Sequence, residues 1–303
     1  MRSAAFPAVA RVVAAPTIAL LLASCEKGVL APAGSVGRAE RTILLDSLAV
    51  MLAIVIPTIL AVLFFAWRFR ASNTAAPYLP HWSYSGRLEL VTWSIPTLII
   101  LFLGGLIWTG SHQVDPGKPL AQGGTPLEVQ VVSLDWKWLF IYPEERLAVV
   151  NELVVPAGRP LHLSLTSGSV MNSFFVPRLG GMIATMGGMT TQLHLQVDRP
   201  GDFAGFSTQF SGDGFPDMHF VVKALPEEEF RAWRSRAYDG ASVTLDRAAY
   251  LELSRQSRDV KPVVYRLGDA GLFRSIAGHE LPFGPGPEQS PRPQSVVMPQ
   301  RGH

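Results

Sequence analysis

The sequence predicts a membrane α-helical hairpin of two transmembrane helices, then an external all-β Greek-key sandwich and a short helical C-terminal extension. Two long apolar runs without a charged residue predict the hairpin, and alternating apolar and polar residues from 126 to 225 predict the sandwich. The composition agrees, because 48% of the 303 residues are hydrophobic and only 17% are charged, which is unusual for a soluble protein. The net charge of +2 argues against a nucleic-acid-binding surface.

Residues 1–24 are predicted to be a lipoprotein signal peptide. Arg2 and Arg11 precede an apolar run, and the run ends in Leu-Ala-Ser-Cys, which resembles a bacterial lipobox. Cys25 would then become the lipidated first residue of the mature protein. It is the single cysteine of the chain, so no disulfide can form within the chain. The alternative is a short signal sequence that contains a buried thiol.

Residues 25–112 are predicted to form the hairpin, with spans at about 44–68 and 88–110. The runs LAVMLAIVIPTILAVLFFAW and LVTWSIPTLIILFLGGLIW are each long enough to cross the hydrocarbon as a helix. The alternative is a buried helical hairpin of a soluble protein. An exported N-terminus places the loop between the spans inside, and this loop carries Arg68, Arg70 and Arg87, as the positive-inside rule expects. Everything after about residue 112 then lies outside.

Residues 113–225 are predicted to form an antiparallel sandwich or barrel of about seven short strands. The alternation is clearest in LEVQVVSLDWKWLFIY, RPLHLSLTSG, TQLHLQV and HFVVKAL. His162 and His194 fall on the polar side of their strands, so we expect solvated surface imidazoles there. Beyond the sandwich, PEEEFRAWRSRA and TLDRAAYLELSRQSR predict helices within an extension at 226–277. Residues 278–303 are rich in Pro and Gly, which predicts a disordered tail.

A lipobox, two spans and an external β-domain in this order resemble subunit II of the haem-copper terminal oxidases. The local matches are DWKWLFIYPE at 135–144, VMNSFFVPRLGGMIATMGGM at 170–189 and the loop within 201–223. Among the branches of that family, MNSFFVPRLG and SGDGF are most similar to the cytochrome bo-type ubiquinol oxidases. The resemblance covers roughly 20–275 and implies a cupredoxin-like fold for the external domain.

The resemblance identifies positions where copper-bearing relatives bind metal. In those relatives the loop has the pattern Cys-x3-Cys-x3-His-x2-Met, and a further His comes from the central turn. Here these positions hold Ser207, Ser211, Phe215, Met218 and, in the turn, Asn172. Without a cysteine or these imidazoles a thiolate-bridged copper centre cannot be built. Gln209 replaces a glutamate that binds magnesium in the family, so we expect no metal at this loop.

The resemblance then implies subunit II of a proton-translocating quinol oxidase in a bacterial inner membrane, with its β-domain in the periplasm. Electrons would come from ubiquinol within the membrane and not from cytochrome c. Haems and copper would belong to the partner, subunit I, with smaller membrane subunits beside it, and this chain would carry no cofactor. Trp136 and Trp138 match the family's aromatic stretch for electron entry, but without copper beneath them we interpret them as packing or interface residues.

Glu89 lies at the inner end of the second span, where an acidic group is a candidate for function. In the family a glutamate at this position lies at the mouth of a proton channel. The alternative is that Glu89 complements the dipole at the start of its helix. Two other functions also stay open: a copper-bearing cytochrome c oxidase subunit II, and a free-standing lipoprotein whose cupredoxin-like domain is a binding module.

Overall fold

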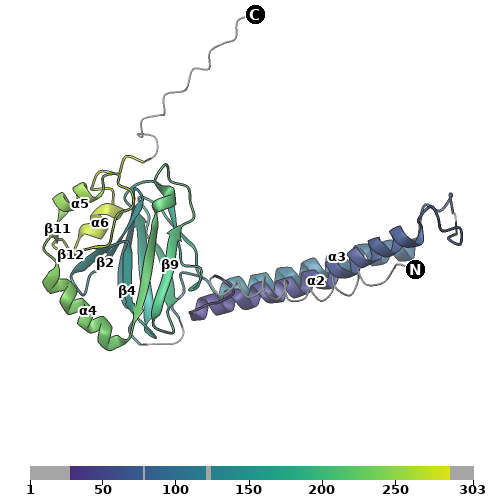
Figure 1. Cartoon of the computed structure of the whole chain (residues 1–303), viewed down its shortest axis with the longest axis horizontal. Helices are drawn as coiled ribbons and strands as arrows, with labels where there is room; N and C mark the ends of the chain where they lie inside the picture. The colour runs from purple at the N-terminus through teal and green to yellow at the C-terminus, as the bar shows by residue number, and fades with distance from the viewer. Residues whose placement is uncertain (1–27, 78, 121–123, 287–303) are drawn as a thin grey trace, which may run out of the picture. The chain divides into compact units, whose positions relative to one another are not determined.

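The computed structural model describes residues 28–77, 79–120 and 124–286, and they form two compact units. One unit runs from Arg38 to Asp115 and contains the helical hairpin, and the other combines the residues up to Gly37 with those from Pro116 onward. Figure 1 shows both units in the colours of the chain. The predicted signal peptide with Cys25, and residues 287–303 of the predicted tail, lie outside the described residues.

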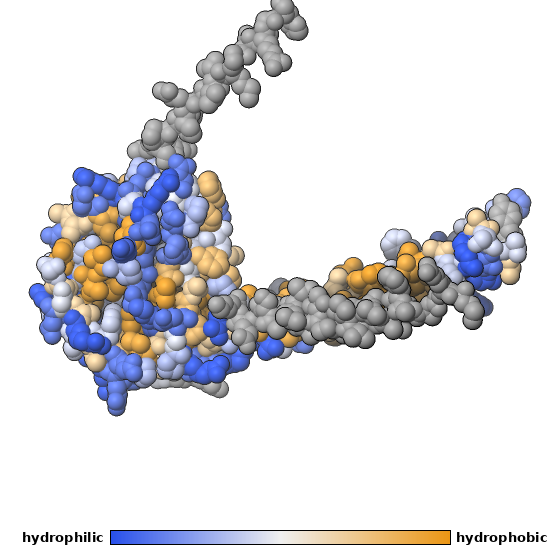
Figure 2. All heavy atoms as spheres, viewed as in Figure 1, coloured by the Kyte–Doolittle hydropathy of each residue, from blue (hydrophilic) through white to orange (hydrophobic). Residues whose placement is uncertain are grey.

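The hairpin consists of α2 (Ser35–Arg68) and α3 (Gly86–Gln113). At 1.5 Å per residue these helices are roughly 50 and 40 Å long, which exceeds the hydrocarbon thickness of about 30 Å. Both are long and apolar enough to cross a membrane, and Figure 2 shows hydrophobic residues on their visible surface. Helix α2 begins about nine residues before the expected span, so it extends beyond the apolar run.

Each helix continues through an internal proline, Pro57 in α2 and Pro96 in α3. The threonine after each proline donates its hydroxyl to the carbonyl four residues earlier, at 2.8 Å for Thr58 and 2.7 Å for Thr97. Such side-chain bonds help a membrane helix to tolerate proline. A Cβ at Gly110 would come within 2.7 Å of the Ile43 side chain, so the absence of a side chain at Gly110 allows the two helices to approach closely.

The β-domain is a sandwich of two sheets. The seven-stranded sheet has the order β11-β12-β3-β2-β1-β5-β8, and the five-stranded sheet has the order β4-β10-β9-β6-β7. The bounds of the first sheet, in chain order, are β1 Leu127–Leu134, β2 Lys137–Tyr142, β3 Leu147–Val150, β5 Pro160–Ser167, β8 Thr191–Gln196, β11 Thr244–Leu245 and β12 Val263–Leu267. Those of the second are β4 Glu152–Pro156, β6 Asn172–Phe175, β7 Ile183–Thr185, β9 Gly201–Ser207 and β10 His219–Leu225.

The sheets are mixed, whereas the alternation predicted antiparallel pairing. Strand β1 runs parallel to β5, and β10 runs parallel to β4. The alternation of apolar and polar residues shows only which face of a strand is buried. The same alternation is found whether the partner strand runs parallel or antiparallel. The pairing direction is therefore set by how the chain crosses between the sheets.

Strand β2 is buried on both faces. Trp138 and Phe140 point into the sandwich, where the Trp138 ring lies 5.5 Å from Phe174 and 5.6 Å from Phe220. Leu139 and Ile141 alternate to the opposite face and pack in a second cluster with C-terminal residues, among them Tyr250, Leu272 and Ile276. The extension thus covers the outer face of the seven-stranded sheet.

The C-terminal extension contains two strands and a third helix, α6, in addition to the two expected helices. Its elements are α4 Glu227–Gly240, β11, α5 Arg247–Leu253, β12 and α6 Leu272–Ala277. Strand β12 pairs antiparallel with β3 and so enlarges the first sheet. The start of the predicted disordered tail also differs, because Gly284 donates its N–H to the Gly168 carbonyl at 2.7 Å and Gly286 to Asp135 at 3.0 Å. Residues 278–286 therefore belong to the folded domain.

Residues 28–37, called here the N-terminal strap, are bound to the β-domain. Ala33 donates its N–H to the Arg178 carbonyl at 2.7 Å, and Gly37 donates to the Leu179 carbonyl at 2.9 Å. The Arg178 guanidinium returns a bond to the Ala31 carbonyl at 2.9 Å. A Cβ at Gly34 would lie 2.2 Å from the Gln196 carbonyl oxygen, so glycine is required for this approach.

Candidate functional site

The five-stranded sheet brings together, at one end of the sandwich, the positions that the resemblance aligns with copper ligands, called here the former copper-ligand positions. Asn172 begins β6, Ser207 ends β9, and Met218 directly precedes β10. Because β10, β9 and β6 are neighbours in this sheet, their ends converge. The connection from β9 to β10 carries Ser211 and the short helix η2 (Phe215–Asp217), which contains Phe215.

Polar side chains at this end bind one another. The Ser207 hydroxyl donates to Asn172 Oδ1 at 3.0 Å, and Asn172 Nδ2 donates to the Val170 carbonyl at 3.2 Å. The Ser211 hydroxyl lies 3.9 Å from Met218 Sδ. The side chains at four of the five former copper-ligand positions are buried, with exposed fractions between 1 and 4%: Asn172, Ser207, Ser211 and Met218.

This donor set does not fit a thiolate-bridged copper centre. It offers hydroxyl, amide and thioether atoms, and hydroxyls and amides are poor ligands for copper compared with thiolate and imidazole. Phe215 is half-buried and lies 5.7 Å from Phe210 between ring centroids. The Gln209 side chain is exposed, and its backbone carbonyl accepts a bond from the Ser207 hydroxyl at 3.3 Å.

Both tryptophans of the aromatic stretch are buried. Trp136 occupies the turn between β1 and β2 with a left-handed φ of 67°, and its indole donates to the Ser211 carbonyl at 3.1 Å. The Arg258 guanidinium lies 5.4 Å above the Trp136 ring, and a Cβ at Gly214 would come within 2.2 Å of that ring. Trp136 thus joins the former ligand loop to the C-terminal extension, and Trp138 lies in the aromatic core.

Two buried charged residues that flank Trp136 were missed by the sequence analysis. Asp135 accepts bonds from the Ser169 hydroxyl and from the Gly286 N–H. Lys137 donates to the Arg255 carbonyl at 2.6 Å, and burial lowers the pKa of its ammonium from 10.5 to about 8, partly offset by Asp135. The signal was available, because Asp135 in the turn and Lys137 at the start of β2 lie next to an otherwise apolar sequence, and buried charges are kept only when they have partners.

Glu89 lies in the first turn of α3, and its side chain is exposed. The cap residue Ser85 makes no side-chain bond to the helix start, so a carboxylate in this turn would stabilise the helix dipole. Glu89 belongs to the helical unit, and the former copper-ligand positions belong to the β-domain unit.

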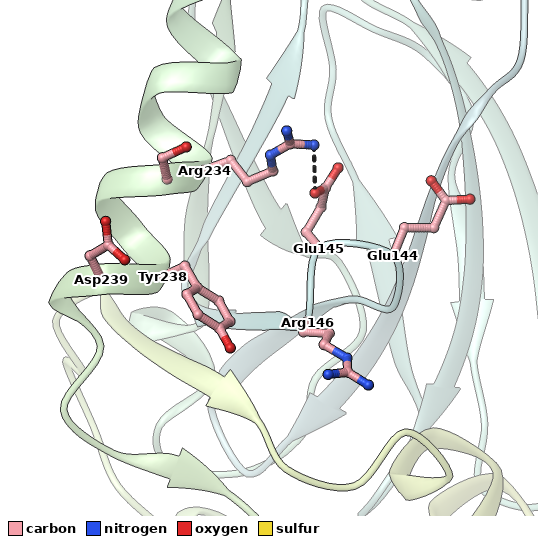
Figure 3. Close-up of a pocket in the computed structure, with 7 residues that line it drawn as sticks. Glu144, Glu145, Arg146, Arg234, Tyr238 and Asp239 are labelled. Carbon is pink, nitrogen blue, oxygen red and sulfur yellow. Dashed lines mark hydrogen bonds and ion pairs between the residues drawn. The ribbon is translucent and has the colours of Figure 1, made fainter.

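A charged surface pocket of about 340 Å³ lies between α4 and the turn that joins β2 to β3. In Figure 3, Arg234 of α4 points toward Glu145 of the turn, and the two form an ion pair at 2.8 Å. Glu144, Arg146 and Asp239 add charges of both signs to its lining. Sites for quinone-like ligands are expected to be mostly apolar, so this pocket does not fit a quinol.

Comparison with known proteins agrees with this architecture. The family "Cytochrome C oxidase subunit II, periplasmic domain" matches residues 129–225. The chain is 49% identical over 261 residues to ubiquinol oxidase subunit 2 of Acetobacter aceti, covering 85% of this chain and 84% of that protein. It is 44% identical over 258 residues to cytochrome bo(3) ubiquinol oxidase subunit 2 of Pseudomonas aeruginosa, covering 85% and 78%. Quinol oxidase subunit 2 of Bacillus cereus is 34% identical over 240 residues, covering 78% and 82%.

A helical membrane hairpin followed by a cupredoxin-like domain defines the class of oxidase subunit II proteins, and the predicted fold class is confirmed. Within that class, hydroxyl and amide groups stand where copper ligands would be expected. The chain belongs to the family of quinol oxidase subunit 2, as the resemblance predicted.

Proposed function

We propose that this chain is the structural and assembly subunit II of a proton-translocating quinol oxidase, which oxidises ubiquinol and reduces oxygen to water. The observation that carries the proposal is the identity of 49% and 44% with subunits named for ubiquinol oxidation. The side chains at Asn172, Ser207, Ser211 and Phe215 support it, because they cannot supply thiolate or imidazole to an electron-accepting copper centre. The alternative of a copper-bearing cytochrome c oxidase subunit is therefore disfavoured.

Electrons then reach the oxidase from the membrane. A quinol is soluble in lipid, so it requires no electron acceptor on the external domain, and the quinol site, the haems and the copper belong to the large subunit I. This chain contributes no redox centre, and smaller membrane subunits complete the complex. The apolar surfaces of α2 and α3, which are exposed along most of their length, would be covered by lipid and by these partner subunits.

The proposed topology places the β-domain in the periplasm of a bacterial inner membrane. The N-terminal strap and residues from Pro116 onward form one folded unit, so both lie on the same side of the membrane. The chain between them must then cross an even number of times, which supports two spans. Arg68, Arg70 and Arg87 would lie on the cytoplasmic side, and acylation of Cys25 would add a lipid anchor.

Glu89 is proposed as a proton-entry carboxylate. It lies near the end of α3 that this topology places at the cytoplasmic surface, and its exposed carboxylate could collect protons there for subunit I. An ionisable group at the edge of a membrane helix is a functional candidate. Stabilisation of the helix start is the alternative role.

Purification of the chain in mild detergent tests the main proposal. We expect it to run in blue-native electrophoresis with a larger, haem-bearing subunit, and the band should oxidise ubiquinol and consume oxygen without oxidising cytochrome c. A chain that migrates alone and without haem would contradict the proposal and favour the free-standing lipoprotein. Oxidation of cytochrome c by the same band would favour the copper-bearing alternative.

A further inference from the structure

We propose that His162 and His194 form a binding site for a divalent late transition metal, Cu²⁺ or Zn²⁺, on the β-domain. His162 lies in β5 and His194 in β8, and they are direct partners in the antiparallel register. Their rings stack with centroids 4.5 Å apart and an angle of 10° between the planes. Both side chains are half-buried, in contrast to the solvated imidazoles that their polar strand positions predicted.

Hydrogen bonds fix the same nitrogen of each ring as the donor. His162 Nδ1 lies 2.6 Å from Glu128 Oε2, and His194 Nδ1 lies 3.2 Å from the Pro116 carbonyl oxygen. An ionised carboxylate and a carbonyl can only accept, so each Nδ1 carries the proton. In the neutral imidazole the other nitrogen, Nε2, then holds a free lone pair, which is the form in which histidine binds a metal.

The lone pair of His162 has no partner within the part of the chain that the structure describes. Its Nε2 atom is buried and makes no hydrogen bond there. Both histidines line a cavity of about 440 Å³, together with Gln192 and Pro160. A buried acceptor beside a cavity requires a donor or a cation, because an unpaired buried polar atom destabilises the fold.

The carboxylate of Glu128, which accepts a hydrogen bond from His162 Nδ1, distinguishes this pair from two histidines that only pack together. Metal-binding histidines usually donate their second ring nitrogen to a carboxylate or a backbone carbonyl, which fixes the ring and raises its basicity. His162 has the carboxylate partner and His194 has the carbonyl partner. Both rings therefore already have the kind of partner that ligand histidines usually have, and each bond must be kept as its ring rotates toward the metal.

A shared metal requires both rings to rotate out of their stacked arrangement. The lone pair of an imidazole lies in the plane of its ring, so two rings at 10° to one another hold their Nε2 lone pairs in nearly parallel planes. Rotation of the rings until the lone pairs converge would allow metal–nitrogen bonds of about 2.0–2.1 Å. Within the described residues no group of three or more His, Cys, Asp or Glu side chains converges, so solvent would complete the coordination. Imidazole suits Cu²⁺ and Zn²⁺, and Cu²⁺ binds most strongly of the divalent first-row ions.

Metal binding would also fix the segment that follows α3. The His194 backbone N–H donates to the Pro116 carbonyl at 3.0 Å, so the same oxygen contacts both the backbone and the ring of His194. A metal that holds the His194 ring would hold this contact in place. The site thus couples metal occupancy to the attachment of residues near Pro116 to β8.

Copper titration of the assembled complex tests the site. The complex would be purified through a tag without histidines and titrated with Cu²⁺ alone, followed by electron paramagnetic resonance. We expect a signal of two equatorial imidazoles, lost in the His162→Gln plus His194→Gln variant and displaced by excess Zn²⁺. Each single variant should weaken binding at least tenfold. Glu128→Gln, which leaves both ligands in place, should weaken it by roughly 10- to 100-fold.

His219→Gln is the matched control, because His219 is exposed on β10 of the other sheet, and it should leave the signal unchanged. Thermal unfolding of each variant verifies that it is folded. A two-imidazole signal that persists in the double variant would overturn the proposal, as would the lack of such a signal in the wild type at 1:1 Cu²⁺. Unaltered affinity in Glu128→Gln would overturn the assigned role of the carboxylate.

Discussion

Ser207 donates its hydroxyl to Asn172 Oδ1 at the end of the sandwich where the resemblance places the copper ligands of relatives, and Asn172 Nδ2 donates in turn to the Val170 carbonyl. The first of these bonds, at 3.0 Å, and the contact of Ser211 with Met218 hold this end of the sandwich together through side chains of the fold itself. A buried polar group is tolerated when it has a partner. The ordering of this loop therefore depends on side-chain bonds and on the Trp136 ring beneath it.

Restoring the ligand set should restore a copper centre. The combined substitutions Asn172→His, Ser207→Cys, Ser211→Cys and Phe215→His supply two thiolates and two imidazoles around the retained Met218. We expect a purple, thiolate-type absorption spectrum after copper addition, with none in the wild type. The matched control carries both histidines but Ser207→Ala and Ser211→Ala, and it should show no such absorption. Failure of the four substitutions in a folded protein would mean that these positions do not converge as described.

Lys137 should make the stability of the β-domain depend on pH above neutrality. Its pKa is about 8 in the folded state against 10.5 when unfolded, so between these values the unfolded chain binds more protons and stability rises with pH. The rise is at most about 3 kcal/mol. Lys137→Met should remove it, as measured by denaturant unfolding of the full chain in detergent at pH 7.5 and 10.5.

Lys223 provides the control, because it is partly exposed and paired with Glu152 at 3.2 Å. Lys223→Met should keep the increase between the two pH values. An increase of the same size in Lys137→Met would show that another group causes it.

Glu89→Gln should lower turnover per haem in the assembled oxidase and leave the assembled amount unchanged. Glutamine keeps the size and most hydrogen bonding of glutamate but cannot ionise, so it removes proton exchange with little effect on packing. Oxygen consumption per haem and the yield of complex are the two measurements. Normal turnover across neutral and alkaline pH, together with a reduced yield, would instead support a role at the helix start, where a carboxylate contributes about 0.3–1 kcal/mol.

At the scale of the elements, the C-terminal extension forms part of the β-domain core. Strand β12 pairs with β3, and Leu272 and Ile276 of α6 pack against the outer face of the first sheet. The capped starts of α4 and α5 predicted those two helices but not α6, and such local signals do not show which surface a helix covers. The sequence of strand β2 did indicate that its outer face is covered. It is nearly continuously apolar, which is typical of a strand buried on both faces.

Ile276→Ala should therefore destabilise the whole β-domain and not only the extension. The side chain is 2% exposed, and removing a buried Ile side chain costs roughly 2–5 kcal/mol. Leu251→Ala on α5 is the matched control, since Leu251 is 39% exposed and its loss should cost much less. Denaturant unfolding followed by tryptophan fluorescence measures both. Equal effects of the two substitutions would contradict the described packing.

For the whole molecule, the sequence predicted the two units and their order, but not how the first residues take part in the second unit. The hairpin followed from two uncharged runs, and the β-domain from the change in periodicity. The N-terminal strap carries no comparable pattern, because it contacts Arg178 and Leu179 through its own backbone groups, which leave little trace in its side chains. Gly34 and Gly37, where a side chain would meet backbone atoms, are the residues of the strap that could have indicated it.

Cys25→Ser should leave the protein in the membrane. Two helical spans anchor it far more strongly than acyl chains do, since a single acyl chain binds only marginally. We expect the wild-type mature chain to begin at an acylated Cys25 and the variant to lack the added lipid mass. Intact-mass analysis and carbonate extraction are the measurements. Release of Cys25→Ser into the soluble fraction would contradict a two-span anchor.

The strap also has a consequence for the order in which the protein folds. Residues 28–37 are synthesised long before their partners, and the bond between Ala31 and Arg178 closes a separation of 147 residues. Contacts of such long range form late in folding. The loss of chain entropy on closing the intervening loop must be overcome before the contact stabilises the folded protein. In pulse-labelled hydrogen exchange during refolding, the amides of Ala33 and Gly37 should therefore gain protection after those of β1, β2 and β5. The first part of the β-domain unit to be synthesised, among the described residues, would thus be among the last to reach its native position.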